Sequence, residues 1–250
     1  MRHSPRILVA ASAFLALSSA PAAAQQGPYV AVFAGFDKPA DEAIDGRNAA
    51  GDLRDIEVAF DNGVLFGGAL GVATRETVHG RGRAEIELSY RSSELESLTL
   101  NGVDRVIGDG SEVGVAAGML NLFYDTPQIQ DRFRFTVGAG FGAASINHDI
   151  RYLIAVPPAT GSIPGQVQIA IPTSEATWAW QLIAGAEIAL SPTLSLTGDI
   201  RYLDPGEVQV ERFVMNSFIN GAPTTTGTLD SVLNAEYSTT SVAVGLRYRF

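Results

Sequence analysis

Apolar and polar residues alternate one by one along the last ten residues of the chain, from Ser241 to Phe250. Successive side chains of a β-strand point to opposite faces, so one face of this segment is apolar and the other carries Arg247 and Arg249. Two unpaired arginines are costly in an apolar core. In a membrane barrel, by contrast, lipid covers the apolar face and the lumen holds the charges. The alternation therefore predicts a transmembrane β-strand.

Seven further segments show the same alternation, and short turns and long polar segments separate them in turn. The eight expected strands are residues 29–36, 64–74, 83–91, 114–125, 133–142, 178–190, 194–202 and 241–250. Their lengths suit the roughly 9–11 residues of a tilted membrane-crossing strand. The sequence thus predicts an all-β fold, an eight-stranded antiparallel transmembrane β-barrel with short periplasmic turns and four long extracellular loops. A soluble β-sandwich is the less favoured alternative.

The start of the chain has the organisation of a secretory signal peptide. Arg2 and Arg6 form a basic beginning, residues 7–17 are apolar, and residues 22–24 offer an Ala-x-Ala cleavage site. This apolar run is shorter than the roughly 20 residues of a transmembrane helix, which disfavours an uncleaved anchor. We expect residues 1–24 to be the signal peptide, cleaved after Ala24, and residues 25–250 to form the barrel domain.

Charged residues on the inner faces of the expected strands form a candidate lumen network. Opposite charges at this density can pair across strands, and an eight-stranded barrel is just wide enough for side chains to fill. A filled, ion-paired plug is the favoured interpretation, and a narrow gated pore is the alternative. A soluble barrel for an apolar ligand would need an apolar inner face, which residues 83–91, 194–202 and 241–250 do not have. The predicted network is Glu85, Glu87, Arg91, Glu187, Asp199, Arg201, Arg247 and Arg249.

The four expected loops, residues 37–63, 92–112, 145–176 and 203–240, are strongly acidic. Together they hold 20 Asp and Glu against 6 Lys and Arg. Acidic, Gly-rich segments are solvated by default. The alternative is an anionic surface that attracts divalent cations or a basic extracellular partner and repels nucleic acid, so no nucleic-acid partner is expected.

The sequence predicts no catalytic, cofactor or metal site. Residues 138–143 fit G-x-G-x-x-A, but they lack the following helix and the acid about 20 residues further on. His79 and His148 have no serine and carboxylate on the same strand face, and the chain has no cysteine. The acids around Asp41 and Asp52 lack the spacing of a tight calcium loop, which leaves only a weak cation site. We expect a protein that is not an enzyme.

Residues 29–36, 85–91, 181–187 and 246–250 resemble the small outer-membrane β-barrel proteins of the OmpA-type and opacity (surface-antigen) group of Gram-negative bacteria. The resemblance implies a cell outer-membrane location, contact with outer-membrane lipid and lipopolysaccharide, and insertion by the outer-membrane assembly machinery. That machinery would read a terminal signal of Leu246, Tyr248 and Phe250. The group carries no single biochemical activity. We therefore expect a structural or surface-interaction role (envelope integrity, surface antigen or adhesion), with a narrow porin-like channel as the alternative.

Overall fold

The computed structural model describes residues 27–48, 50–130, 132–156, 165–219 and 222–250, so the predicted signal peptide lies outside the described residues. The part of the chain that is described consists of strands and their connections. No helix in it is long and apolar enough to cross a membrane. The strands are β1 Gly27–Pro39, β2 Glu42–Asn48, β3 Leu53–Phe60, β4 Gly63–Ala73, β5 Arg81–Leu100, β6 Val103–Asp104, β7 Val106–Ile107, β8 Glu112–Asp125, β9 Phe133–Val156, β10 Gly165–Ala189, β11 Leu194–Asp204, β12 Glu207–Ile219, β13 Ala222–Glu236 and β14 Thr239–Arg249.

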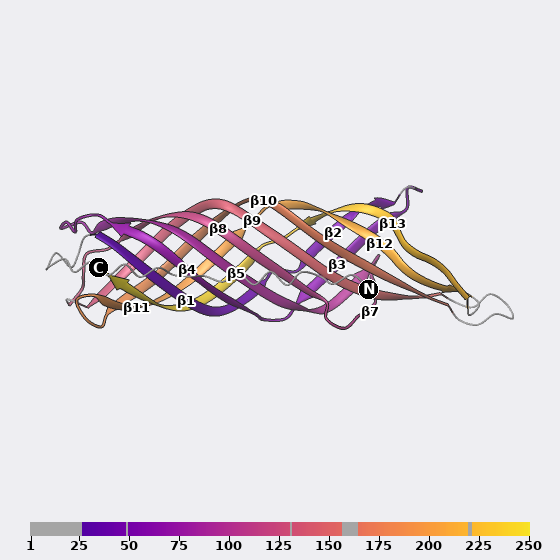
Figure 1. The fold of residues 1–250 in the computed structure, drawn as a ribbon, viewed down its shortest axis with the longest axis horizontal. Coiled ribbons are helices and arrows are strands. Elements are labelled where there is room, and N and C mark those ends of the chain that lie inside the picture. Colours follow the sequence, from indigo (N-terminus) through magenta and orange to yellow (C-terminus); the bar gives the residue numbers. More distant parts are fainter. Residues whose placement is uncertain (1–26, 49, 131, 157–164, 220–221) are drawn as a thin grey trace.

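Every strand pairing is antiparallel, and the pairings return to their starting point. From β1 the hydrogen-bonded neighbours are β4, β5, β8, β9, β10, β11 and β14, and β14 pairs again with β1. The sheet therefore closes on itself, and its strands coil around one long axis (Figure 1). The expected all-β antiparallel fold is confirmed.

The closed sheet has two halves along this axis. The lower half comprises β1, β4, β11, β14 and the parts of β5, β8, β9 and β10 beside them. In the upper half β2 pairs with β3 and β13, β3 pairs with β5, and β12 pairs with β10 and β13. The long strands β5, β9 and β10 run through both halves. The lower half, which contains the C-terminus, is at the left of Figure 1, and the upper half is at the right.

The prediction of long loops was wrong, because those segments are largely strands. Residues 37–63 contain β2 and β3, residues 203–240 contain β12 and β13, and β9 and β10 pair continuously as far as Val156 and Gly165. Most of the charged residues that suggested loops lie on outward faces that alternate with buried apolar residues, although Asp37, Glu42 and Arg212 are buried. On β3, for example, Ile56 and Val58 are buried while Glu57 is exposed.

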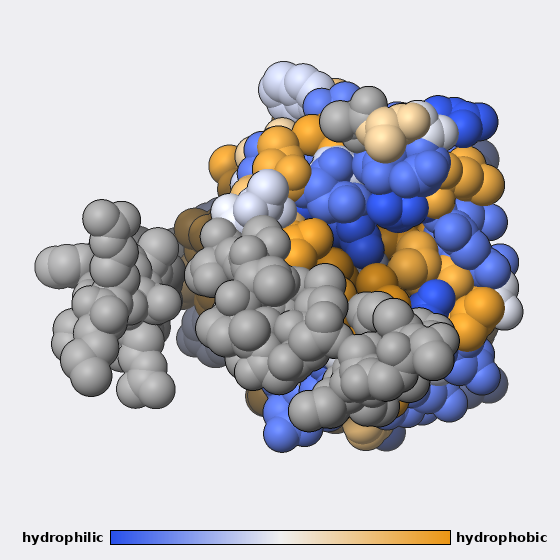
Figure 2. Space-filling model, turned by 90° about the vertical axis from the view of Figure 1, so that its right-hand side faces the viewer, coloured by the Kyte–Doolittle hydropathy of each residue, from blue (hydrophilic) through white to orange (hydrophobic). Residues whose placement is uncertain are grey.

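The two halves have opposite polarity. In the lower half Leu88 is 69% exposed and its neighbour Glu87 is 0% exposed, so apolar residues face outward and polar ones inward. In the upper half most charges face outward and most of the interior is apolar. Figure 2 views the upper end and shows blue hydrophilic residues over much of the described rim, with orange hydrophobic residues between them. The expectation of a polar inner face therefore holds for the lower half alone.

Candidate functional site

The lower interior contains a dense set of buried ion pairs, here called the ionic cluster. Its arginines come from β5, β9 and β14, and its carboxylates come from β5, β8, β10 and the turn before β5. Strand parity places the strand residues of this set inside the closed sheet. The ionic cluster consists of Arg81, Arg83, Arg134, Arg247, Arg249, Glu76, Glu85, Asp125 and Glu187.

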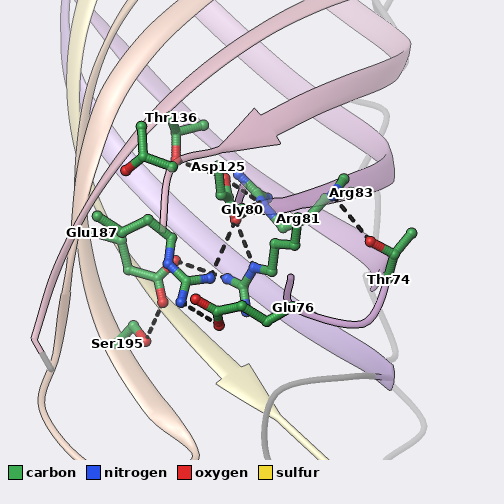
Figure 3. Close-up of polar contacts among 12 residues, drawn as sticks. Thr74, Glu76, Gly80, Arg81, Arg83, Asp125, Thr136, Glu187 and Ser195 are labelled. Carbon is green, nitrogen blue, oxygen red and sulfur yellow. Dashed lines mark hydrogen bonds and ion pairs between the residues drawn. The ribbon is translucent and has the colours of Figure 1, made fainter. Parts of the chain in front are cut away.

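Asp125 is the centre of one part of the cluster. Its side-chain oxygens accept hydrogen bonds of 2.8 Å from Arg81 Nε, 2.8 Å from Arg83 Nε and 2.8 Å from Thr136 Oγ1 (Figure 3). All four side chains are buried. Charge-assisted bonds of this kind are among the strong ones in proteins, so Asp125 holds β5, β8 and β9 together at the lower end.

Glu187 is the centre of the other part of the cluster. It accepts hydrogen bonds from Arg247 Nη1 at 2.6 Å, from Ser195 Oγ at 2.7 Å and from Arg81 Nη2 at 3.3 Å, and Arg249 also contacts it. Its carboxylate therefore links β5, β10, β11 and β14 (Figure 3).

An aromatic residue joins the cluster to β1. Tyr29 donates a hydrogen bond of 2.5 Å to Glu85 Oε1 and accepts one of 2.9 Å from Arg83. The Cζ atoms of Arg83 and Arg247 lie 5.7 and 5.1 Å from the centre of the Tyr29 ring. Such stacking of a cation on an aromatic ring is favourable, more so when water is excluded.

A second polar layer, here called the middle layer, crosses the lower interior above the cluster. Glu87 accepts hydrogen bonds from Arg201 at 2.8 Å and from Asn121 at 3.0 Å, and Gln181 donates to Asn121 at 2.7 Å. Arg201 also contacts Asp199. The middle layer thus connects β5, β8, β10 and β11.

Arg91 stands apart from both groups. It lies above them, fully buried, with its Nε 3.5 Å from Asp37 Oδ1 and its Nη1 3.1 Å from Ser89 Oγ. Asp37 in turn accepts a hydrogen bond of 2.5 Å from Ser241. The structure therefore brings seven of the eight predicted residues into the cluster and the middle layer, and pairs the eighth with an acid that we had assigned to a loop.

The predicted network lacked five of the nine members of the ionic cluster, namely Glu76, Arg81, Arg83, Asp125 and Arg134. Arg81 continues the inward parity of residues 83–91, so extending the strand by two residues would have found it. Asp125 and Arg134 belong to expected strands, but nothing in the sequence indicates that they meet. Glu76 lies in a turn, and only its 2.7 Å contact with Arg134 identifies it.

Inward glycines let large side chains fill the lower interior. A Cβ placed on Gly67 would lie 2.5 Å from Phe33, and one on Gly138 would lie 2.3 Å from Phe123. The space that each glycine leaves empty is therefore occupied by a ring from the neighbouring strand. A cavity of about 30 Å³ remains beside the cluster, which is room for one or two water molecules.

The upper interior is an apolar core that sequence reasoning did not predict. Its members are buried isoleucine, valine, leucine, alanine, phenylalanine, methionine and tyrosine side chains, most of them from β2, β3, β5, β8, β9, β10, β11, β12 and β13, for example Ile44, Phe60, Val115, Ile146 and Val210. Packing of this kind resembles that of a water-soluble β-barrel filled by side chains.

An acid and a base also pair within this apolar core. His148 Nε2 on β9 is 3.0 and 3.3 Å from the two oxygens of Glu42 on β2, and both side chains are buried. The pair joins strands that are not neighbours in the sheet. His148 therefore bridges the interior, and it does not lie at the start of an outer loop as we had expected.

Ion pairs also occupy the top of the apolar core. Arg212 donates a hydrogen bond of 2.7 Å to Tyr152 and contacts Asp230, while Arg54 Nε lies 3.2 Å from Asp230. Burial alone would raise the pKa of Asp230, but the hydrogen bond from Arg54 and the charges of Arg212 and Arg54 outweigh it and hold this pKa below its usual value. Burial raises the pKa of Tyr152.

The terminal residues Leu246, Tyr248 and Phe250 all face outward and are exposed. Tyr248 and Phe250 meet edge to face, with ring centres 5.5 Å apart.

Among the described residues no group of three or more His, Asp or Glu side chains is placed to hold a metal ion. The acids around Asp41 are divided between the two faces, because Glu42 points into the core while Asp45 is exposed.

Comparison with known proteins identifies the family. A family model described as "Outer membrane protein beta-barrel domain" matches residues 7–250, which confirms the resemblance seen in the strand patterns. OprG from Pseudomonas aeruginosa superimposes with a TM-score of 0.50 at 12% identity, over 90% of this chain and 98% of OprG. Neisserial surface protein A gives 0.47 at 13% identity over 90% and 97%, and AlkL gives 0.44 at 17% over 95% and 97%. At 12% identity the likeness to OprG shows the fold alone. No curated protein matches the chain.

Proposed function

The chain belongs to the outer membrane protein beta-barrel domain family, and from this premise we propose that it is a non-conducting barrel with a structural or surface-interaction role in the cell outer membrane. The strands of the described residues line up end to end as eight continuous antiparallel segments around the barrel, for example β1 followed by β2 and β13 followed by β14. The lower half crosses the membrane and the upper half projects from the cell. Short turns then lie in the periplasm.

The observation that carries this proposal is the filled interior. The ionic cluster and the middle layer close the lower half with buried, paired charges, and the apolar core closes the upper half. A water-filled channel would need a continuous polar path. The cavity beside the cluster has room for about one or two water molecules, which is too small a volume to form such a path.

The outer surface of the lower half suits a bilayer. Its exposed apolar residues include Leu70, Leu122 and Val244, and aromatic pairs border them: Phe141 and Trp178 stack with ring centres 5.4 Å apart. Aromatic girdles mark the interfaces of membrane barrels. The 25 residues of β10 would extend about 85 Å at ~3.4 Å per residue. At a tilt of about 40° it would rise about 65 Å, which is about two and a half times the height of a ~25 Å apolar band.

The upper half is the part that would meet partners. Many acidic side chains are exposed on its outer surface. A surface rich in negative charge attracts basic molecules and cations. We propose contacts with lipopolysaccharide near the membrane and with a basic extracellular partner further out. Nucleic acid is disfavoured by the same charge. Neither a cofactor nor an enzyme activity forms part of this proposal.

Export and insertion complete the proposal. The signal peptide of residues 1–24 would direct the chain through the inner membrane and be cleaved after Ala24. The outer-membrane assembly machinery would then read the exposed terminal side chains Leu246, Tyr248 and Phe250, as the family resemblance implies.

Conductance of the refolded mature chain in planar bilayers tests the filled interior. We expect no steady current. A steady current that scales with salt concentration would replace the proposal with the alternative, a narrow porin-like channel, because only a continuous water path conducts ions at a constant level.

A further inference from the structure

The wall of the upper half has an interruption between β10 and β12, here called the seam. β10 pairs with β12 through residues 166–170 and with β11 from Trp180 onward. The seam lies between these two ladders, with residues 171–179 on one side and residues 205–212 on the other. No backbone pairing joins these two stretches, which both belong to the described part of the chain. On their far sides β10 pairs with β9 and β12 pairs with β13, so the seam has two free strand edges.

A side chain takes the place of a backbone acceptor at the seam. The backbone N–H of Glu211 donates a hydrogen bond of 3.0 Å to Thr173 Oγ1. Alternate residues of an antiparallel strand direct their N–H and C=O groups to the same side, so Glu207 and Gln209 also turn these groups toward the seam. A row of backbone groups without ladder partners is a template for pairing with another chain.

The exposure of β10 shows that the wall is open at the seam. Glu175 has the same strand parity as Thr173 and Gln181, and those two side chains are buried. Glu175 is nevertheless exposed, and so are its neighbours Ser174 and Ala176. In a closed wall one of two successive side chains is shielded by the interior. Three successive exposed residues therefore mean that water, and an entering chain, can reach β10 here.

Both sides of the seam carry exposed acids. They are Glu175 on β10 and Glu207 and Glu211 on β12, whereas Arg212, the one basic residue of the two stretches, is buried. Glu207 also lies directly opposite the exposed Glu236 of β13, and like charges in this position are unfavourable. A basic occupant would relieve this repulsion. A second copy of the chain, with a net charge of −10, has the wrong sign.

We propose that the seam binds an extended, basic segment of an extracellular protein, which adds a strand to the free edge of β12. In this mode of recognition main-chain hydrogen bonds supply affinity and alternate side chains supply specificity. Lysine or arginine side chains of the segment would lie beside Glu175, Glu207 and Glu211. The seam reaches down to Trp178, one of the aromatic residues that border the lower half. This inference rests on the proposed function, because it assigns the basic extracellular partner to one place.

Peptide binding to the refolded mature chain in phosphatidylcholine nanodiscs tests the proposal. The probe is a fluorescein-labelled peptide of alternating lysine and threonine with the length of the seam, and fluorescence anisotropy measures its affinity. A second peptide has the same sequence with every backbone nitrogen methylated, which keeps the charge and removes strand pairing. We expect its affinity to be lower by more than about tenfold, because several hydrogen bonds are lost. Equal affinities, or no binding of the first peptide, would overturn the proposal.

Two variants locate the binding on β12. Gln209→Pro removes an N–H from the free edge without a change of charge, and proline is tolerated where the N–H is outside a ladder. We expect this variant to lose most of the binding. Glu211→Gln should weaken binding up to about fivefold, and Glu57→Gln, which removes an exposed acid from β3, should leave it unchanged.

Wild-type affinity of Gln209→Pro would show that the site is wrong. If that variant does not fold, the comparison of the two peptides on the wild-type chain decides. Conductance of the same preparation keeps this inference apart from the proposed function. A barrel that neither conducts nor binds the peptide contradicts the seam alone, whereas a steady current contradicts the filled interior.

Discussion

Glu187 on β10 accepts a 2.6 Å hydrogen bond from Arg247 on β14, although β11 lies between these two strands. Ser195 of the intervening β11 donates to the same carboxylate at 2.7 Å. Three strands are thus held by one acid inside the closed sheet. Because both charged side chains are buried, the pair is a sensitive probe of whether the lower interior is filled or wet.

Removing one partner of a buried pair should destabilise the protein. Breaking such a pair costs about 3–5 kcal/mol when the remaining charge has no other partner. We expect Arg247→Gln and Glu87→Gln to cost less, up to about 3 kcal/mol, because Glu187 keeps Arg81 and Arg201 keeps Asp199. Urea unfolding in lipid vesicles measures this. A double-mutant cycle of Glu87→Gln with Arg201→Gln gives the coupling energy. A hydrated pore would show no coupling and little loss of stability.

The reversed polarity of the two halves predicts opposite responses to the same substitution. Val244 and Val232 both face outward, with exposed fractions of 59% and 46%, on β14 and β13, which follow one another in the chain. We expect Val244→Arg to cost about 2–4 kcal/mol in a bilayer, because it faces lipid, and Val232→Arg to cost less than about 0.5 kcal/mol, because it faces water. Equal costs in lipid vesicles would contradict the assignment of the membrane to the lower half.

Inward glycines should not tolerate side chains. In Gly138→Val the new Cβ would lie 2.3 Å from Phe123 and 3.0 Å from the carbonyl oxygen of Leu122. Overpacking of this kind costs about 1–3 kcal/mol. Gly198→Val is the control, since nothing lies closer than 4.0 Å to its Cβ position. Comparable losses of unfolding free energy for both variants would mean that the interior is not filled.

The ion pairs at the top of the apolar core should weaken at low pH. The pKa of Asp230 is below its ordinary value of 3.8 in the folded state, so its contribution is complete above about pH 4 and is lost as the pH falls further. We expect a loss below about 1 kcal/mol, because the group is partly exposed. Hydrogen exchange of β13 between pH 7 and pH 3 measures it. Asp230→Asn should have lower protection at pH 7 and a weaker pH dependence, and identical profiles would contradict the assignment.

The terminal aromatic residue tests the assembly proposal. Deleting Phe250 should lower the amount of barrel in the outer membrane while cleavage after Ala24 continues, because the exposed aromatic terminus is the proposed recognition signal. Phe250→Tyr keeps the ring and should insert normally. Fractionation of cells that express the three forms measures insertion. Normal insertion of the shortened chain would contradict the proposed terminal signal. The assignment of the fold as a barrel would not be affected.

The two-residue alternation predicted the inward and outward faces of the strands in the lower half. In the upper half it did not reveal the strands. Residues such as Glu87 and Leu88 alternate so clearly that their faces follow from the period of a strand. In β2 and β3 the same alternation is present, but it was hidden by the density of acids around Asp45 and Asp55, which are typical of solvated loops. A polar outer face in water and a polar loop have the same composition, so composition could not separate them.

The sequence by itself determined the all-β class, the two-residue period and which side chains share a face, because these depend only on neighbours in the chain. The tertiary structure alone decided which charges meet. Asp125 and Arg81 are far apart in the sequence, and their 2.8 Å contact arises from the register between β5 and β8. It also decided the direction of each face, since a strand has the same alternation whether lipid or water lies outside, and only closure of the sheet defines an interior.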